Sequence, residues 1–205
     1  FLYRLEVDDH VQTGVMGLVP VTEPGDRRLL RHEAVRPGRA DLLTRHLLEV
    51  GMSSSPISLT YRTDDVLDAA IAAGCADEPV LEADGDGIHQ TVWALSGEAA
   101  EALIVAMGDR PLYVTDGHHR LAAAVEALHR NPGIDGNHPL RWTQAVLFPD
   151  AEMQVLAAHR RVGDRTGRSA EDLIAALSTV GHLAPCADIA EARPDGPGAI
   201  GIYLA

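Results

Sequence analysis

The residues with the clearest chemical potential lie together in the stretch "LYVTDGHHRLAAAVEAL", where an apolar run ends in Asp116-Gly117-His118-His119-Arg120. This pattern predicts a strand that ends at Asp116 and a helix that begins directly after it. The first N–H groups of a helix lack intrahelical partners and the helix dipole is positive there, so such a turn suits an anion. Gly117 would let a ligand approach the backbone, and Arg120 carries a forked donor for phosphate.

The other side chains of the turn fit the same chemistry. Asp116 can hold a Mg²⁺ ion that also touches the phosphate, and His118 and His119 can donate to phosphate oxygens or exchange protons. The competing interpretation is that Asp116 only caps the helix. A cation such as Arg120 in the first helical turn is unfavourable, and a bound anion would remove that cost. We therefore favour ligand binding over structural capping.

The composition limits the partners of this site. The chain has 205 residues, 46% of them hydrophobic, and a formal net charge of -13. Such a charge repels nucleic acid and anionic membranes, so we expect neither as a partner. The sequence has no apolar run of membrane-spanning length, and Cys75 and Cys186 lack metal-like spacing, which indicates reduced thiols in a cytoplasmic protein. The sequence is compatible with a homo-oligomer.

Strand and helix patterns mix along the chain and include hairpins, which predicts an α+β fold with a mixed sheet and packed helices. We expect one domain over residues 1–205, and the start without Met is compatible with a fragment of a longer chain. Helices are expected over residues 40–51, 64–74, 96–108, 118–130 and 169–181. Strands are expected over residues 1–7, 12–21, 55–62, 79–84, 88–95, 111–116, 141–149 and 199–205.

The stretch "YVTDGHHRLAAAVEAL" resembles the signature of a widespread prokaryotic family catalogued as a domain of unknown function, which usually shows "ADGHHR" before a helix. Three further stretches resemble segments of that family in the same order: "LLRHEAVRPGRADLLTRHL", "GIHQTVWAL" and "VLAAHRRVGD". Val35 departs from it, because the family often has Thr or a neighbouring polar residue there.

The same signature also resembles the phosphate-binding turn of the ParB/sulfiredoxin-like superfamily, whose free serine kinases share the fuller "DGHHR" form. The resemblance implies a ParB/sulfiredoxin-like nucleotide-binding core. It further implies a phosphate cradle at residues 117–120, a metal ligand at Asp116 and, through "HE", a catalytic base at Glu33. Sulfiredoxin chemistry needs a cysteine in this turn, and none is present.

These resemblances imply a kinase that transfers a phosphoryl group from ATP or ADP, with Mg²⁺, to a free hydroxy amino acid such as serine. The alternative is a non-catalytic, ParB-like nucleotide-binding regulatory module. In the kinase, Glu33 would accept the proton of the acceptor hydroxyl, with His119 as the second catalytic candidate. From the residues alone, Glu33 also fits a solvated loop of mixed charge.

Further candidates lie outside the turn. His89 and Trp93 have an even spacing, which places both on one face of a strand, where they can line a substrate pocket or belong to a hairpin with a core Trp. His32 and His159 are further pocket candidates, and Arg160 is a candidate second anion contact. Zinc is not expected, because adjacent histidines in a turn seldom hold one ion and no third ligand has helical spacing.

Overall fold

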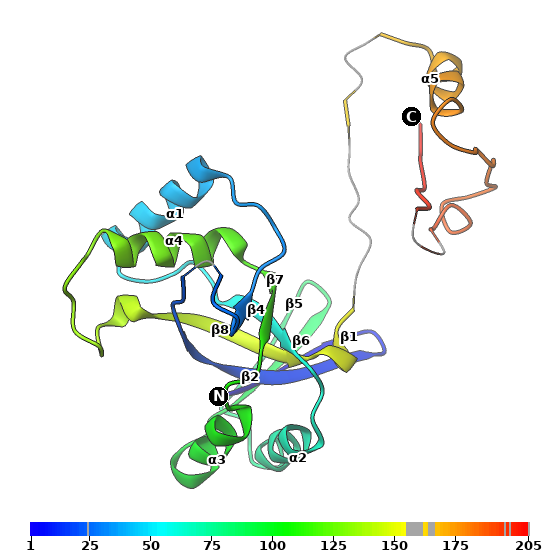
Figure 1. Ribbon diagram of the computed structural model, residues 1–205. Coiled ribbons are helices and arrows are strands. Elements are labelled where there is room, and N and C mark those ends of the chain that lie inside the picture. Colours follow the sequence, from blue (N-terminus) through cyan, green and yellow to red (C-terminus); the bar gives the residue numbers. More distant parts are fainter. Residues whose placement is uncertain (24, 155–161, 164–166, 195, 197, 205) are drawn as a thin grey trace. The chain divides into compact units, whose positions relative to one another are not determined.

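We describe the protein from a computed structural model of residues 1–205, of which residues 24, 155–161, 164–166, 195, 197 and 205 are not described (Figure 1). The chain divides into two compact units, Phe1–Val155 and Leu156–Ala205. The single domain expected from the sequence stays a prediction. Among the described residues, no helix has the length and apolar character needed to cross a membrane.

The first unit is built on one mixed sheet of eight strands in the order β3-β7-β4-β8-β2-β1-β6-β5. β3 runs parallel to β7 and β4 runs parallel to β8, whereas the other neighbours are antiparallel. This arrangement confirms the predicted α+β class. The strands are β1 Leu2–Val7, β2 His10–Pro20, β3 Leu29–Leu30, β4 Ile57–Tyr61, β5 Leu81–Gly85, β6 Ile88–Trp93, β7 Leu112–Asp116 and β8 Trp142–Pro149.

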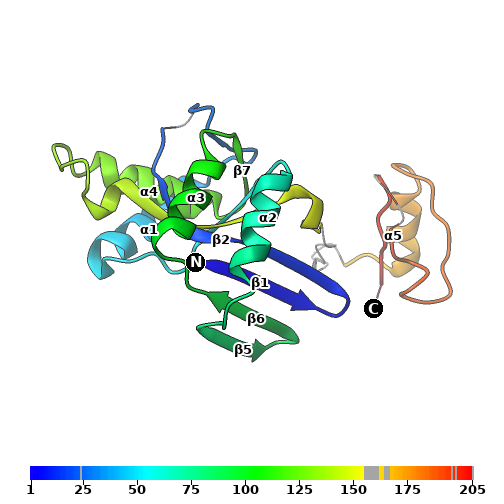
Figure 2. The same ribbon diagram turned by 90° about the horizontal axis from the view of Figure 1, so that it is seen from below.

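Four helices of the first unit form two pairs, α1 beside α4 and α2 beside α3 (Figures 1 and 2). Two 3₁₀ turns flank β8, and the second unit contains α5. The bounds are α1 Pro37–Val50, α2 Asp65–Gly74, α3 Gly97–Met107, α4 His118–His129, α5 Ala170–Leu177, η1 Pro139–Arg141 and η2 Asp150–Glu152.

The helix and turn signals of the sequence act locally as expected. Asp64 accepts hydrogen bonds from two N–H groups of the first turn of α2, and Ser169 forms a capping box at the start of α5. Asp86 and Gly87 take φ values of 53° and 76° between β5 and β6, which is the conformation of a tight hairpin turn. Ser96 lies at the N-cap position of α3, but its side chain accepts no capping hydrogen bond.

One continuous apolar core joins the sheet to both helix pairs. Alternate residues of β4, Ile57, Leu59 and Tyr61, are all buried, and they belong to the same cluster as Leu67 of α2 and Leu121 of α4. Burial of these side chains supplies the main favourable free energy of folding. It fixes the start of α4 beside the start of β4, which is where the candidate site lies.

Two details of the sequence prediction differ from the structure. The strand expected over residues 199–205 is wrong, because residues 199–204 have no regular secondary structure. The two-residue strand β3 was not predicted, because a run this short has no readable periodicity. The stretch "VLAAHRRVGD", which resembles a segment of the family, lies largely outside the described residues.

Candidate functional site

The turn from β7 to α4 has the exposed helix start that the sequence predicts. Gly117 occupies the N-cap position with φ 93°, so Asp116 does not cap the helix as the competing interpretation required. Within the described residues, no side chain caps α4 and its first turn contains no acid. The first backbone N–H bonded across this turn is that of Leu121, to the carbonyl of Gly117. The N–H groups of residues 118–120 therefore remain available to an anion.

A bulge in the sheet sets the direction of Asp116. Ser58 of β4 pairs with Asp116 and Leu59 pairs with Val114, so Thr115 has no opposite residue. The hydroxyl of Thr115 donates a hydrogen bond of 2.8 Å to the Ser58 hydroxyl, which holds the bulge in place. Bulges commonly redirect side chains next to functional sites. Here the bulge leaves the Asp116 side chain 77% exposed at the end of the strand.

Arg120 folds back over the turn instead of extending into solvent. Its Nη2 lies 2.5 Å from Oδ2 of Asp116, and its side chain is only 18% exposed. A Cβ atom on Gly117 would lie 3.0 Å from both Nε and Nη2 of Arg120 and 2.8 Å from Cγ2 of Ile57. Glycine is therefore required at position 117 both by its positive φ and by the close approach of these two side chains.

The parallel pairing of β3 with β7 brings Glu33 to this turn. Leu30 pairs with Tyr113, and both strands then run on in the same direction. Glu33 follows Leu30 by three residues, as Asp116 follows Tyr113. Because the carboxyl ends of parallel neighbours meet at one edge, residues far apart in sequence converge here.

His118 is the centre of this convergence. Its side chain is 2% exposed, its Nε2 accepts the backbone N–H of His32 at 3.4 Å, and its Nδ1 lies 3.6 Å from Oε2 of Glu33. The latter distance is too long for a direct hydrogen bond and marks an electrostatic contact. The His32 ring meets the His118 ring edge-on, with 4.5 Å between the ring centroids. Burial, and secondarily His32, lowers the pKa of His118, so its imidazole is neutral at pH 7.

His119 makes the corresponding contact at the far end of the same loop. Its Nε2 accepts the backbone N–H of Arg36 at 3.1 Å. Arg36 is the N-cap residue of α1, and its own side chain makes no capping hydrogen bond. Nothing in the sequence pointed to these two backbone N–H groups as histidine partners, because a backbone donor leaves no trace in the residue types.

Arg31 adds a partly buried cation beside the loop. Its Nη2 donates a 2.8 Å hydrogen bond to the carbonyl oxygen of Thr22, whereas its buried Nε finds no partner among the described residues. Burial lowers the pKa of Arg31, although the guanidinium stays charged at neutral pH. The turn is therefore flanked by positive charge in a protein whose net charge is -13.

His89 and Trp93 do not join this site. Their strand, β6, is separated from β7 by four strands in the sheet order. Trp93 is buried in the core, where its Nε1 donates to the carbonyl oxygen of Asp77 at 3.1 Å and the Arg4 guanidinium lies 5.0 Å from its ring centroid. This position agrees with the alternative of a hairpin with a core Trp. His159 and Arg160, the other expected contacts, lie outside the described residues.

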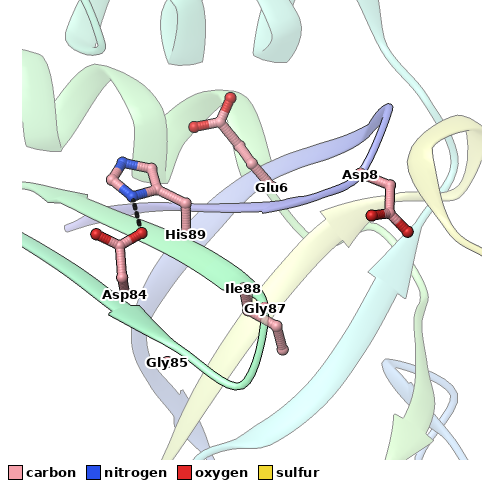
Figure 3. A pocket seen from close by; sticks show the side chains of 7 residues that line it. All are labelled: Glu6, Asp8, Asp84, Gly85, Gly87, Ile88 and His89. Carbon is pink, nitrogen blue, oxygen red and sulfur yellow. Dashed lines mark hydrogen bonds and ion pairs between the residues drawn. The ribbon is translucent and has the colours of Figure 1, made fainter.

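His89 instead lines a shallow acidic hollow between two hairpin ends (Figure 3). Its Nδ1 lies 2.8 Å from Oδ1 of Asp84, and this hydrogen bond raises the pKa of His89. The hollow has a volume of about 470 Å³ and is lined by Glu6, Asp8, Asp84, Gly85, Gly87, Ile88 and His89. Within the described part of the chain, neither this hollow nor the turn gathers three side chains that could hold a metal ion.

Taken together, the fold and the turn define an α+β protein with an uncapped, cationic helix start and a carboxylate loop beside it. The chain belongs to the family described as "Protein of unknown function (DUF1015)", whose model matches residues 1–205. No curated protein and no solved structure matches the chain.

Proposed function

We propose that the protein is a nucleotide-binding small-molecule kinase that transfers a phosphoryl group from ATP or ADP to a free hydroxy amino acid such as serine. The observation that carries this proposal is the convergence of an uncapped helix start, Arg120 and the Glu33 carboxylate at one turn. A phosphotransferase needs positive charge at the transferring phosphate and a carboxylate at the acceptor hydroxyl. Arg120 and the residue that faces Glu33, His118, both belong to the first turn of α4, which supports this proposal.

The phosphate end of the site would use the backbone N–H groups that follow Gly117. In the free protein Ile57 and Arg120 fill the space beside Gly117, so Arg120 has to move before an anion can reach the backbone of the turn at this residue. Arg120 would turn from Asp116 to the phosphate, exchanging one charge-assisted contact for another. The imidazoles of His118 and His119 already accept backbone N–H groups through Nε2, so in this arrangement those two nitrogens do not donate to a phosphate.

The residues of the turn fit a Mg²⁺ ion of the kind that kinases use. Mg²⁺ keeps several waters and binds through one or two carboxylates together with substrate phosphates, so a group of three protein ligands is not required. Asp116 supplies one exposed carboxylate beside the anion site. When bound there, Mg²⁺ would neutralise charge on the nucleotide phosphates.

Glu33 suits the role of the base because its side chain is 60% exposed and, among the described residues, no arginine lies within ion-pair distance of it. The His118 Nδ1 that faces it belongs to a neutral ring, which leaves the carboxylate charge uncompensated. A carboxylate without a paired cation keeps its capacity to accept a proton from a hydroxyl group.

The ParB/sulfiredoxin-like character of the core and a cytoplasmic location also stay proposals.

The alternative function, a ParB-like nucleotide-binding regulatory module without transfer, uses the same turn but needs no base. A substitution of Glu33 distinguishes the two functions, because only the kinase requires its carboxylate. A salt-dependent complex with duplex DNA would favour the module, whereas we expect none at a net charge of -13.

The test is calorimetric titration with ADP and ATP, with and without Mg²⁺, followed by ³¹P NMR of phosphoryl transfer to serine. Replacing Arg120 by Ala should weaken nucleotide binding by about 1.5–3 kcal/mol, the usual range for a charged hydrogen bond. Glu33→Gln should abolish transfer and leave nucleotide affinity nearly unchanged. Arg45→Ala and Glu49→Gln, on the exposed surface of α1, are matched controls that should change neither quantity.

Asp116→Asn should raise the affinity for metal-free phosphate and lower the benefit of Mg²⁺ for nucleotide binding. It removes the partner of Arg120, so affinity for metal-free phosphate should rise by up to about fivefold, the value of an exposed ion pair. It also removes the proposed metal ligand, so the gain in nucleotide affinity on adding Mg²⁺ should shrink. A fall in metal-free phosphate affinity would show that Arg120 is not the anion ligand.

A further inference from the structure

We propose that His118 and His119 are positioning residues that hold the loop of residues 32–36, and with it Glu33, against the start of α4. In this assignment the two imidazoles act on the protein backbone and not on the phosphate. The inference deepens the proposed function, since it rests on Glu33 as the base of the same site. It also changes the roles that the resemblance implied for both histidines.

The hydrogen-bond geometry of the two rings carries this assignment. Each Nε2 faces a backbone N–H, of His32 at 3.4 Å and of Arg36 at 3.1 Å. A ring nitrogen that accepts an N–H bond carries no proton, so it cannot donate to a phosphate at the same time. Both rings are thereby fixed as the tautomer with the proton on Nδ1.

Apart from the two imidazoles, the backbone of the loop is held, in the described part of the chain, only at its end, where the Arg36 carbonyl oxygen accepts the N–H groups of Arg39 and Ala40. Within the described residues, no further backbone hydrogen bond reaches the N–H groups of residues 32–36. The two imidazoles bind the loop at its ends, at His32, one residue before Glu33, and at Arg36, three residues after it. The rings themselves are fixed because α4 packs against α1 and His118 is buried.

The anchored loop explains how an exposed carboxylate keeps one position. Glu33 is 60% exposed, so solvent does not constrain its side chain, and the 3.6 Å approach to His118 Nδ1 is its only contact with an ionisable side chain among the described residues. Displacement of a catalytic group by about 1 Å can cost on the order of 100-fold in rate. Loss of either anchor should therefore act on the chemical step and not on nucleotide binding.

Matched substitutions distinguish the role of Nδ1 from the role of Nε2 in each ring. His119→Gln keeps an acceptor near the position of Nε2, whereas His119→Ala removes it. At position 118, Gln keeps the acceptor for the His32 N–H but loses the group that faces Glu33. His118→Asn keeps a donor near Nδ1 and loses the acceptor.

Three measurements on each variant test the proposal: hydrogen exchange of the His32 and Arg36 amides, nucleotide affinity, and kcat for transfer. We expect His119→Ala to speed exchange at Arg36 by at least about tenfold, because its only protecting bond is lost. It should lower kcat by about 10–100-fold while nucleotide affinity changes less than about twofold. His119→Gln should restore both the slow exchange and most of kcat. At position 118, Asn should speed exchange at His32, and Gln should not.

A different pattern would overturn the assignment. If His119→Ala weakens nucleotide binding about tenfold while Arg36 exchange stays slow, the ring is a phosphate ligand. A protonated Nε2 in the free protein, seen by ¹⁵N NMR of the imidazoles, would also overturn the assignment, because that nitrogen could not accept the backbone N–H. Failure of the proposed function is distinguishable. If the wild-type protein transfers no phosphoryl group, the kinase is wrong, and the exchange rates and ring tautomers still decide whether the histidines hold the loop.

Discussion

Substitution of Gly117 by Ala is the most direct test of the turn, because two separate features of the structure oppose a side chain there. The residue has φ 93°, a conformation that costs a residue with a Cβ roughly 1–2 kcal/mol. The new Cβ would also lie 2.8 Å from Cγ2 of Ile57 and 3.0 Å from two nitrogens of Arg120. Overpacking of this kind typically costs about 1–3 kcal/mol.

Part of this cost is offset in the unfolded state. Replacing Gly by Ala restricts the unfolded chain, which returns about 0.4–1 kcal/mol. The net loss of unfolding free energy should therefore be about 1–4.5 kcal/mol. Ile57 is 1% exposed and cannot move away, whereas Arg120 can swing out. The strain should thus fall mainly on the contact with Ile57, and Arg120 should lose its position over the turn.

Gly133 provides a control with nearly the same backbone conformation. Its φ is 88°, and no atom lies within 4 Å of a Cβ built on it. Gly133→Ala should therefore cost about 1 kcal/mol or less, from the backbone alone. Urea denaturation followed by far-UV circular dichroism measures both variants. Equal losses for Gly117→Ala and Gly133→Ala, within about 0.5 kcal/mol, would refute the close approach of Ile57 and Arg120 to the turn.

Two further predictions concern parts of the fold outside the turn. Asp64→Ala should lower stability in urea more than Ser96→Ala does, because only the Asp64 side chain accepts N–H bonds at its helix start, and the Ser96 change should stay within about 0.5 kcal/mol. Hydrogen bonds from the backbone and side chain of Thr63, and then from Arg62, lower the pKa of Asp150 to about 2. A carboxyl with a lowered folded pKa stabilises the protein above its unfolded pKa of about 3.9 and loses this effect as pH falls towards 2. Asp150→Asn should therefore lower the thermal midpoint at pH 7, and the difference from wild type should shrink between pH 4 and pH 2; a difference that persists unchanged would contradict the role of the ionised group.

The elements that could be predicted from the sequence are those whose signals are local. The helix α2 begins after Asp64 and ends at Gly74 because capping and helix propensity act within a few residues. The hairpin of β5 and β6 follows from its Asp-Gly turn for the same reason. The strand-to-helix turn at Gly117 belongs to this group, since an apolar run, a glycine and an alanine-rich helix lie side by side in the sequence.

Features that depend on distant pairing could not be predicted in this way. The tail from 199 to 204 alternates apolar residues, but Ile200 is 81% exposed and no strand forms there, because alternation alone does not supply a partner strand. The even spacing of His89 and Trp93 says which face of β6 they occupy but not where β6 lies in the sheet. The order of strands in the sheet places His89 and Trp93 away from the turn, and this order cannot be predicted from the periodicity of the sequence.

The opposite charges at the turn make binding of a cation and of an anion depend on each other. Asp116 and Arg120 neutralise one another in the free protein, so an anion alone must compete with a carboxylate, and a cation alone must compete with a guanidinium. A cation that engages Asp116 releases Arg120 for an anion, and an anion that engages Arg120 releases Asp116 for a cation. By linkage, the gain in affinity must be equal in both directions. The turn should therefore select a phosphate that arrives with its metal ion over a free anion of the same charge, which suits a nucleotide better than inorganic sulfate or phosphate.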